Sequence, residues 1–423
     1  MPSLHVAVLD EEFPYPLTSG KRIRSFQLLT RLAKRHRVTY IAHQNADSAE
    51  LRESVTALRN HGIHVMPVEY RVPPKAGARF YGRLLGNLAS PLPYSVATHA
   101  SRAMQRAMDR LAAQDPPDLW HCEWTPYAQA MYRRPGRWVV MAHNVESVIW
   151  QRYTESESNP LKRWFLRQQW RKFEYFERWA YNAATRAVAV SAEDAERIEL
   201  QFGVESVDVV DNGVDTAFFT PDSAVPREPH CMLFLGSLDW RPNLDAVRLL
   251  LDDVFPRVRA AEPRASLDIV GRKPPDSLRA ELENREGVRL HADVPDVRLF
   301  LRRASVLAVP LRIGGGSRLK ILEALATGLP VVTTTVGVEG LRLTPGTHCT
   351  VADGPEGFSA ALLDTMSDPG AARDQAAAGR ARVLRDYDWA GLADRLDQVW
   401  QAAAATPLRQ PATGPLLRAL ARR

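Results

Sequence analysis

Two series of alternating strand and helix patterns run along this chain of 423 residues and restrict its fold more than any other feature. In each series, short apolar runs typical of buried parallel strands alternate with segments whose apolar residues recur at helical spacing. A Pro-rich stretch with neither period, 216–230, separates them. Alternation of this kind predicts a parallel sheet with helices on both faces. We therefore expect an α/β protein with two doubly wound, Rossmann-like domains that face a central cleft.

The predicted organisation has five parts: a first domain over 1–215, a linker over 216–230, a second domain over 231–390, a helix over 391–405 that crosses back to the first domain, and a disordered tail over 406–423. The strands expected in the first domain are 5–9, 38–42, 63–68, 119–122, 138–142, 187–190 and 207–210. Those of the second are 232–235, 266–270, 288–290, 306–310 and 329–333. Helices are expected at 22–36, 48–60, 98–113, 161–181, 244–261, 276–284, 295–303 and 318–327.

The net charge of +6 is unevenly distributed along the chain. Residues 1–190 hold 27 Lys and Arg against 16 Asp and Glu, whereas the remainder holds 28 against 33. A basic first half predicts an anionic partner, either a phosphate-bearing molecule or an anionic membrane surface. Charge alone leaves nucleic acid open as a third partner, although no further feature favours it.

Other bulk features exclude several classes of protein. The three cysteines are far apart in the sequence, which gives no support to a disulfide framework or a zinc site. No apolar run reaches the roughly 18 residues of a membrane span, and the first ten residues lack a basic leader. We therefore expect a cytoplasmic protein, with peripheral attachment to the inner face of the membrane as an open alternative.

The segment 306–332 carries the strongest functional signal. It reads as a strand, three consecutive glycines at 314–316, a helix, a tight Gly-Leu-Pro turn and a second strand. Glycines before a helix allow close backbone approach to a ligand, and the free N–H groups of the first turn favour an anion. Cations are unfavourable at a helix N-terminus, so Arg318 and Lys320 indicate a bound diphosphate. The alternative is an ordinary turn of a doubly wound protein, since the spacing matches neither GxGxxG nor GxxxxGK[ST].

With this segment the chain resembles the family 4 retaining glycosyltransferases of GT-B fold over most of its length. In that family a Glu on the helix before the Gly-x-Pro-Val turn holds the donor ribose, and Glu323 takes that place. The earlier Glu of the family pair falls at Gly315, where backbone amides would replace it. One branch of the family shares the run Gly-Gly-Gly-Ser-Arg-Leu-Lys-Ile-Leu-Glu-Ala. The resemblance implies donor contacts from Gly314, Gly315, Gly316, Ser317, Arg318, Lys320 and Glu323.

Further donor contacts are implied at other predicted strand ends. Arg241 and Asn243 lie in a segment similar to the branch signature, with a capped turn whose helix starts at Asn243 as the alternative. Ser19 and Gly20 resemble the family's glycine loop near the donor phosphates, while the neighbouring Arg22 and Arg24 could equally be helix-surface cations. The remaining donor candidates are Arg272, the backbone of Val294, and Glu339, which could equally be a surface carboxylate.

The acceptor side is predicted from the ends of two strands in the first domain. Glu123 falls where relatives place an acceptor-activating residue and could accept a proton from a hydroxyl, although a Glu after a strand is often only a helix cap. His143 is the second candidate base. Asn144 and Glu146 complete a His-Asn-Val-Glu motif similar to that of the branch and would contact the acceptor, unless these polar groups only satisfy the backbone.

An aromatic and basic helix is predicted over 161–181. Its aromatic stripe could lie in a membrane interface, or it could pack into the first domain. Together with these features, the family resemblance implies a metal-independent, retaining transfer of a hexosyl group from a UDP- or GDP-sugar to a hydroxyl of a glycan or lipid-linked acceptor. No cofactor is expected, because the nucleotide-sugar is a substrate. The alternatives are a GT-B nucleotide-sugar epimerase and a non-catalytic binder of sugar nucleotides or nucleic acid.

Overall fold

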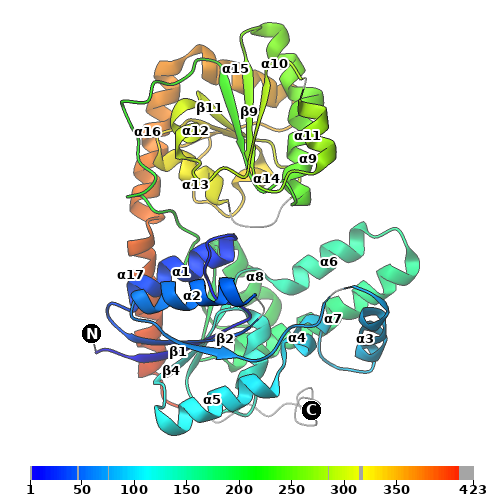
Figure 1. The fold of residues 1–423 in the computed structure, drawn as a ribbon, viewed down its shortest axis with the longest axis vertical. Helices are drawn as coiled ribbons and strands as arrows, with labels where there is room; N and C mark the ends of the chain where they lie inside the picture. Colours follow the sequence, from blue (N-terminus) through cyan, green and yellow to red (C-terminus); the bar gives the residue numbers. More distant parts are fainter. Residues whose placement is uncertain (1, 45–46, 75, 284, 314–317, 409–423) are drawn as a thin grey trace. The chain divides into compact units, whose positions relative to one another are not determined.

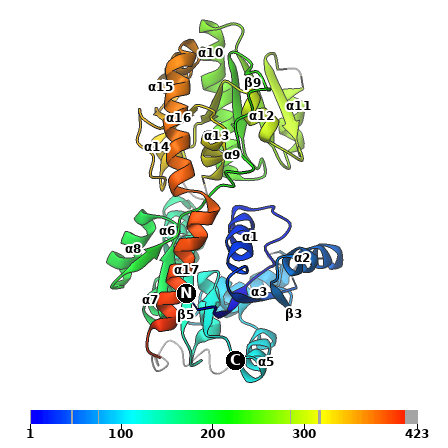
Figure 2. The ribbon, with the colours of Figure 1, turned by 90° about the vertical axis from the view of Figure 1, so that its left-hand side faces the viewer.

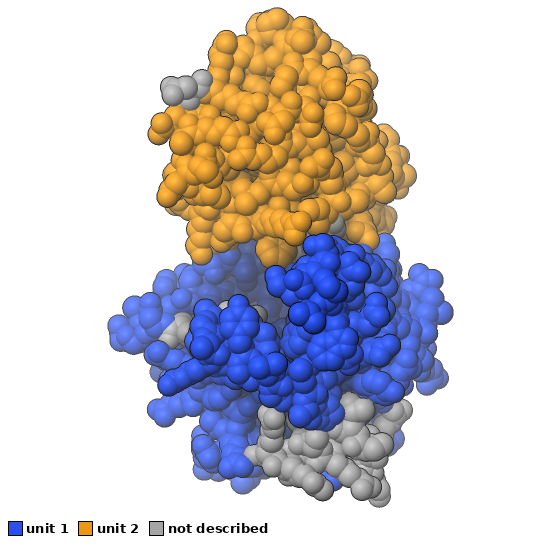
Figure 3. All heavy atoms as spheres, turned by 90° about the vertical axis from the view of Figure 1, so that its right-hand side faces the viewer, with its two compact units in different colours: residues 1–211, 392–423 blue, residues 212–391 orange. Residues whose placement is uncertain are grey.

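The computed structural model describes residues 2–44, 47–74, 76–283, 285–313 and 318–408. The chain divides into two compact units, each with its own parallel sheet. Unit 1 comprises residues 1–211 and 392–423, and unit 2 comprises residues 212–391, as coloured in Figure 3. Two parallel-sheet α/β domains are the expected fold class.

Unit 1 contains a seven-stranded parallel sheet in the order β3-β2-β1-β4-β5-β6-β7. Its strands are β1 (His5–Asp10), β2 (Arg37–His43), β3 (His64–Val68), β4 (Leu119–Cys122), β5 (Trp138–Ala142), β6 (Arg186–Ala189) and β7 (Val207–Val209). Every residue of β1, β4 and β5 is buried, as expected for strands covered on both faces. The strand order reverses between β1 and β4, the place where doubly wound sheets bind ligands.

Helices surround this sheet in Figure 1. They are α1 (Gly20–Leu32), α2 (Ser48–Asn60), α3 (Ala78–Leu88), α4 (Tyr94–His99), α5 (Arg102–Gln114), α6 (Glu146–Ser156), α7 (Pro160–Ala183) and α8 (Ala192–Phe202), with a 3₁₀ helix at Thr125–Met131. The apolar stripe of α7 is mostly buried: Phe173, Phe176 and Tyr181 face the core. Packing is therefore the main role of this stripe, the second of the two interpretations offered for it.

Unit 2 contains a six-stranded parallel sheet in the order β10-β9-β8-β11-β12-β13. Its strands are β8 (Cys231–Leu235), β9 (Ser266–Gly271), β10 (Val288–Ala292), β11 (Val306–Val309), β12 (Val331–Thr333) and β13 (Thr350–Val351). Its helices are α9 (Arg241–Leu249), a π turn (Leu250–Val254), α10 (Phe255–Ala261), α11 (Asp276–Leu282), α12 (Arg298–Arg303), α13 (Leu319–Ala326), α14 (Thr335–Val338), α15 (Pro355–Ser367) and α16 (Pro369–Asp386). Here the strand order reverses between β8 and β11.

The C-terminal helix α17 (Trp389–Ala405) belongs to unit 1 from residue 392 onward. Figure 2 shows it running beside the N-terminal strand. Its Asp397 accepts a hydrogen bond from His36 Nε2 at 2.9 Å, and the side chain of Gln401 donates to the carbonyl of Pro2 at 2.8 Å. These contacts join the two ends of the sequence in one core.

Two differences from the expected elements have local causes. The expected helix over 98–113 is two helices, because Ser101 caps the start of α5 and ends the α4 segment before it. Helix α3 was not predicted, because two glycines interrupt its pattern and its apolar residues do not face the core. Among the described residues, no helix is both long and apolar enough to cross a membrane.

Candidate active site

Polar side chains gather where the strand order of the unit 1 sheet reverses. Asp10 ends β1, Glu123 directly follows β4 and His143 directly follows β5. Because the carboxyl ends of parallel strands meet at one edge, these three residues come together although 133 positions separate the first from the last. The predicted residues Glu123 and His143 are therefore neighbours.

Glu123 lies at the centre of a hydrogen-bond network and is only 2% exposed. One carboxylate oxygen accepts from Ser25 Oγ at 2.6 Å and lies 3.3 Å from His143 Nε2; the other accepts from His121 Nε2 at 2.7 Å. Burial disfavours the carboxylate, but the two histidines outweigh burial and hold the pKa of Glu123 well below its usual range. The geometry therefore favours a positioning role for Glu123, which orients His143, over the predicted role of Glu123 as the acceptor base.

The protonation of His121 follows from a contact with the far end of the chain. Trp400 Nε1, on α17, donates to His121 Nδ1 at 3.1 Å. Since an indole nitrogen can only donate, Nδ1 is the acceptor and Nε2 carries the proton that reaches Glu123. The C-terminal helix thus fixes the tautomer of a residue behind the site, a contact that local sequence patterns do not reveal.

His143 is the titratable group at the open side of this network. Its pKa is lowered by burial, which outweighs the opposing effect of Glu123. His143 Nε2 lies 3.3 Å from the Glu123 carboxylate without an aligned hydrogen bond; a neutral ring with its proton on Nε2 would have its lone pair on Nδ1, where it could accept a proton. Asn144 is half-buried beside it. Glu146 Oε1 accepts from Trp124 Nε1 at 2.9 Å, so this motif residue holds an aromatic side chain in place.

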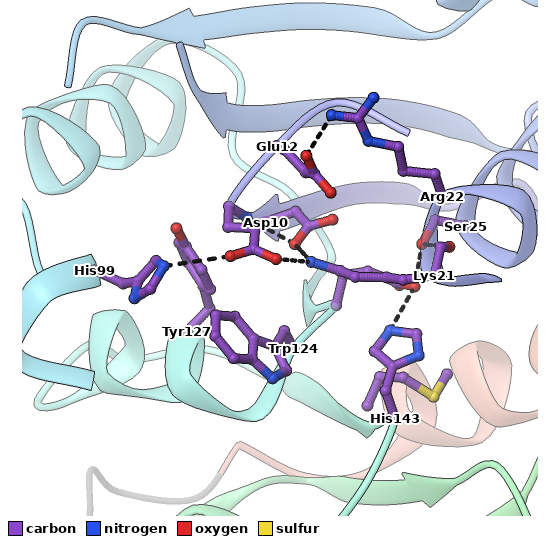
Figure 4. Close-up of polar contacts among 12 residues, drawn as sticks. Asp10, Glu12, Lys21, Arg22, Ser25, His99, Trp124, Tyr127 and His143 are labelled. Carbon is purple, nitrogen blue, oxygen red and sulfur yellow. Dashed lines mark hydrogen bonds and ion pairs between the residues drawn. The ribbon is translucent and has the colours of Figure 1, made fainter. Parts of the chain in front are cut away.

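Lys21, in the first turn of α1, is enclosed by acidic groups (Figure 4). Its ammonium donates to Asp10 at 2.6 Å and to Glu11 at 3.0 Å, and it lies 5.3 Å from the centre of the Trp124 ring. Tyr40 also donates to Asp10, at 2.7 Å. The positive charge at this strand end is therefore neutralised by carboxylates of unit 1 itself.

The predicted glycine loop of unit 1 has a structural role in this arrangement. Ser19 is exposed, and its Oγ caps α1 by accepting from Arg22 N at 3.2 Å; Gly20 is the first residue of that helix. Arg22 pairs with Glu12 and, at 2.8 Å, with Glu50. Arg24 is fully buried and donates to the carbonyl of Val210 at 2.7 Å. The two arginines are therefore not free surface cations.

In unit 2, a partly buried lysine lies at the reversal between β8 and β11. Lys320, in the first turn of α13, donates to Asn243 Oδ1 at 2.8 Å and lies 4.6 Å from the centre of the Phe234 ring. Asn243 Nδ2 in turn donates to the carbonyl of Ser237 at 2.8 Å. A Cβ at Gly236, directly after β8, would lie 2.8 Å from Lys320 Nζ and 2.9 Å from Asn243, so a larger residue there would displace both side chains.

The surroundings of Lys320 lower the pKa of its ammonium group. Burial lowers its pKa to about 7, and the positive charge of Arg318 adds to this effect while Glu323 opposes it. Burial also raises the pKa of Glu323, one turn further along α13, to about 7. Among the described residues, no carboxylate lies within ion-pairing distance of Lys320. An anion bound next to Lys320 would stabilise the protonated, positively charged ammonium that burial disfavours.

Arg318 stands at the N-cap of α13 and is buried. Its guanidinium donates to the carbonyl of Val336 at 2.9 Å and lies 3.8 Å from the carboxylate of Glu339. The predicted residues Arg318 and Glu339 are thus brought together, as are Lys320 and Asn243. Asn243 is not the start of its helix, because α9 begins at Arg241 after the N-cap Trp240.

The remaining predicted donor residues are exposed on unit 2, partly buried in it, or outside the described residues. Arg241 and Arg272 are exposed, at the start of α9 and after β9. Val294 is partly buried against the core of unit 2. Gly314, Gly315, Gly316 and Ser317 lie outside the described residues. Four residues of these sites were not predicted from the sequence: Asp10, Glu11, Lys21 and Trp400. An acidic run at a strand end followed by a Lys-Arg pair was the available signal for the first three.

Two family models match this chain. Residues 20–218 match "Glycosyltransferase Family 4" and residues 229–368 match "Glycosyl transferases group 1". Among curated relatives, glycogen synthase of Mycobacterium tuberculosis is 29% identical over 240 residues, covering 54% of this chain and 56% of the relative. A phosphatidyl-myo-inositol mannosyltransferase of Mycobacterium leprae is 30% identical over 215 residues, covering 48% of this chain and 55% of the relative. The chain thus spans just over half the length of the curated relatives it matches.

Solved structures show the same fold over nearly the whole chain. Sucrose-phosphate synthase of Thermosynechococcus elongatus aligns with a TM-score of 0.68 at 18% identity, covering 95% of this chain and all of that one. Anabaena HepE in complex with UDP and glucose aligns with a TM-score of 0.64 at 15% identity, covering 94% of this chain and all of that one. At these identities the likeness establishes the GT-B fold.

Proposed function

We propose that this chain, whose two parts match family 4 and group 1 glycosyltransferase models and which has the GT-B fold, is a retaining glycosyltransferase. It moves a hexosyl group from a UDP- or GDP-sugar to a hydroxyl of a glycan or lipid-linked acceptor, in polysaccharide or glycolipid biosynthesis. Anabaena HepE was solved with UDP, and the name of a Corynebacterium glutamicum relative, 29% identical over 214 residues, specifies GDP-mannose, so both nucleotides remain candidates. The transfer uses no bound metal.

The observation that carries this proposal is Lys320. A partly buried ammonium whose hydrogen-bond acceptor is the neutral Asn243 supports a preformed site for the diphosphate of the donor. Negative charge grows on that diphosphate as the sugar leaves, and a cation already in place stabilises it without reorganisation. Arg318 lies next in the same turn, and Glu323 supplies the carboxylate that resembles the ribose ligand of the family.

The acceptor hydroxyl is placed at the other strand-end site, next to His143. Its proton is received by Nδ1 of the neutral ring, while Glu123 holds Nε2–H and stabilises the imidazolium that forms. His143 is thus the catalytic residue on this side and Glu123 a positioning residue. Because Lys21 and Arg22 are already paired with carboxylates, the acceptor group bound here is neutral and rich in hydroxyls.

A ligand screen with the full chain tests the proposal. Thermal denaturation with UDP, GDP, ADP and their sugars should show a concentration-dependent rise for one uridine or guanosine pair, because a ligand of the folded state stabilises it. The stabilising sugar nucleotide is then incubated with glycan and lipid-linked acceptors, with and without EDTA, and the product linkage is read by NMR. Retention of the anomeric configuration in both conditions is expected.

The alternatives give different results in the same experiment. An epimerase would isomerise or hydrolyse the sugar nucleotide without an acceptor. A non-catalytic binder would show no transfer to any acceptor, and a nucleic-acid binder would bind RNA with a steep salt dependence. Either result would overturn the proposed transfer.

A further inference from the structure

The outward face of α3 is apolar along its whole length. The residues at helical spacing on this face are Ala78, Tyr81, Gly82, Leu85, Gly86 and Ala89, all of them exposed. Tyr81 is 65% exposed and Leu85 is 70% exposed. A Cβ at Gly82 or Gly86 would meet no atom within 4 Å, so the face is open at both glycines. A surface helix normally presents polar residues here, and an exposed apolar stripe indicates an interaction surface.

The opposite side of α3 is firmly attached to unit 1. The buried Asn87 accepts from Gln169 Nε2 at 3.0 Å, and its carbonyl accepts from Lys172 Nζ at 2.7 Å. Arg83 donates to the hydroxyl of Tyr94 at 3.2 Å. The apolar stripe is therefore presented by a helix seated on α7, and Figure 1 shows α3 beside that helix.

The two segments that meet at this contact contain no acidic residue. Between Glu69 and Asp109 the sequence has six Lys and Arg and no Asp or Glu; between Glu157 and Glu174 it has five and none. On α7, the exposed residues Trp164, Arg167, Arg171 and Tyr175 recur at helical spacing. The basic excess of the first half is thus concentrated here, whereas the cations at the strand ends are paired.

We propose that α3 and the first half of α7 form a docking surface for a lipid bilayer that contains anionic lipids. Tyr81 and Leu85 enter the interface, and Arg79, Arg167 and Arg171 meet the headgroup phosphates. The membrane contact anticipated for the aromatic helix therefore falls mainly on α3, because the stripe of α7 is largely buried. This surface shares no residue with the strand-end sites, so the inference does not depend on the proposed transfer.

Charge and shape favour a bilayer over other occupants. A second copy of the chain would bring two acid-free surfaces together, and like charges across an interface are repulsive. A nucleic acid needs cations along the centre of its binding face, where α3 has leucine, tyrosine and glycine. An anionic bilayer matches both the apolar stripe of α3 and the arginines beside it, because its hydrocarbon region lies below a layer of headgroup phosphates.

Flotation with lipid vesicles tests the proposal on the full chain. The protein should float with phosphatidylcholine vesicles that contain phosphatidylglycerol and much less with phosphatidylcholine alone. The double change Tyr81→Ser with Leu85→Ser should lower the partition coefficient by at least about tenfold, from the apolar surface lost. Each of Arg79→Gln, Arg167→Gln and Arg171→Gln should lower it by about fivefold. The matched controls are Leu200→Ser, at a 79% exposed leucine of α8, and Arg110→Gln on α5.

A fluorescent label separates insertion from simple charge attraction. All three native cysteines are buried, so Leu85→Cys can be labelled selectively with a polarity-sensitive dye, with Leu200→Cys as the control. Emission should shift to the blue for position 85 alone when phosphatidylglycerol vesicles are added. No shift, or equal loss of flotation in the Leu200→Ser control and the α3 double variant, would overturn the proposal. The proposal would also be overturned if light scattering showed that the α3 substitutions dissociate a dimer while flotation stays unchanged.

Discussion

Each unit carries a lysine at the second residue of a helix beside its strand-order reversal, and the two lysines differ in their partners. Lys21 of α1 lies between Asp10 and Glu11; burial disfavours its ammonium, but these carboxylates outweigh burial and raise the pKa. Lys320 of α13 has the neutral Asn243, and burial lowers its pKa to about 7. The same position thus holds a neutralised cation in unit 1 and a cation awaiting an anion in unit 2. In the proposed function, this difference favours unit 2 for the diphosphate and unit 1 for a neutral acceptor.

The largest effect expected from the comparison of Lys21 with Lys320 is a loss of stability when Lys21 is replaced. Lys21→Met leaves the buried Asp10 and its neighbour Glu11 without their ammonium, which should lower the free energy of unfolding by about 3 kcal/mol. Urea unfolding followed by circular dichroism measures it. The exposed Lys34→Met serves as control and should change stability by less than about 0.5 kcal/mol. Wild-type stability in Lys21→Met would contradict the neutralised-cation account.

Lys320→Met should have the opposite profile. It removes a cation that burial disfavours, so the unliganded protein should be no less stable than wild type, while donor affinity falls on the order of 100-fold. Isothermal titration with the donor nucleotide measures the affinity. Lys273→Met, an exposed lysine of the same unit, should leave it within about twofold. Loss of stability without loss of affinity would make Lys320 a structural residue.

The positioning role assigned to Glu123 predicts a change in pH dependence. Glu123→Gln should lower kcat by about 30-fold, because the amide no longer stabilises the imidazolium of His143. Since Glu123 raises the pKa of His143, its removal should shift the acidic limb of the kcat profile to lower pH. An unchanged profile with lowered stability alone would show that Glu123 only supports the fold. Ser25→Ala, which removes another partner of the same carboxylate, should lower kcat less.

A smaller effect is expected at Glu323. Glu323→Ala should weaken donor binding by about tenfold, the size of one charge-assisted hydrogen bond to a ribose hydroxyl. Titration with UDP or GDP is compared with titration with inorganic diphosphate. The comparison separates the affinity contributed by the nucleoside from that contributed by the diphosphate. The loss should appear with the nucleotides and not with diphosphate; equal loss with both would place Glu323 at the phosphates.

The fold followed from the sequence because alternating patterns depend on local periodicity. The donor side was also accessible, since Arg318, Lys320 and Glu323 lie in one continuous segment. The surroundings of Lys21 depend on contacts between separate segments, and Trp400 reaches His121 across 279 positions, which no local pattern records. Asn243 was predicted as a donor contact, with a helix start as the alternative, and only the fold shows that it accepts a hydrogen bond from Lys320.

The most direct test of the central claim is proton uptake on donor binding. At about pH 8, above the lowered pKa of about 7, Lys320 is largely neutral in the free protein, and a bound diphosphate should restore its proton. Donor affinity should therefore fall as the pH rises above about 7. Calorimetric titration of UDP or GDP in two buffers of different ionisation enthalpy measures the uptake directly. We predict net uptake that falls in Lys320→Met and persists in Glu323→Gln and Lys21→Met. Equal uptake in wild type and Lys320→Met would contradict the account.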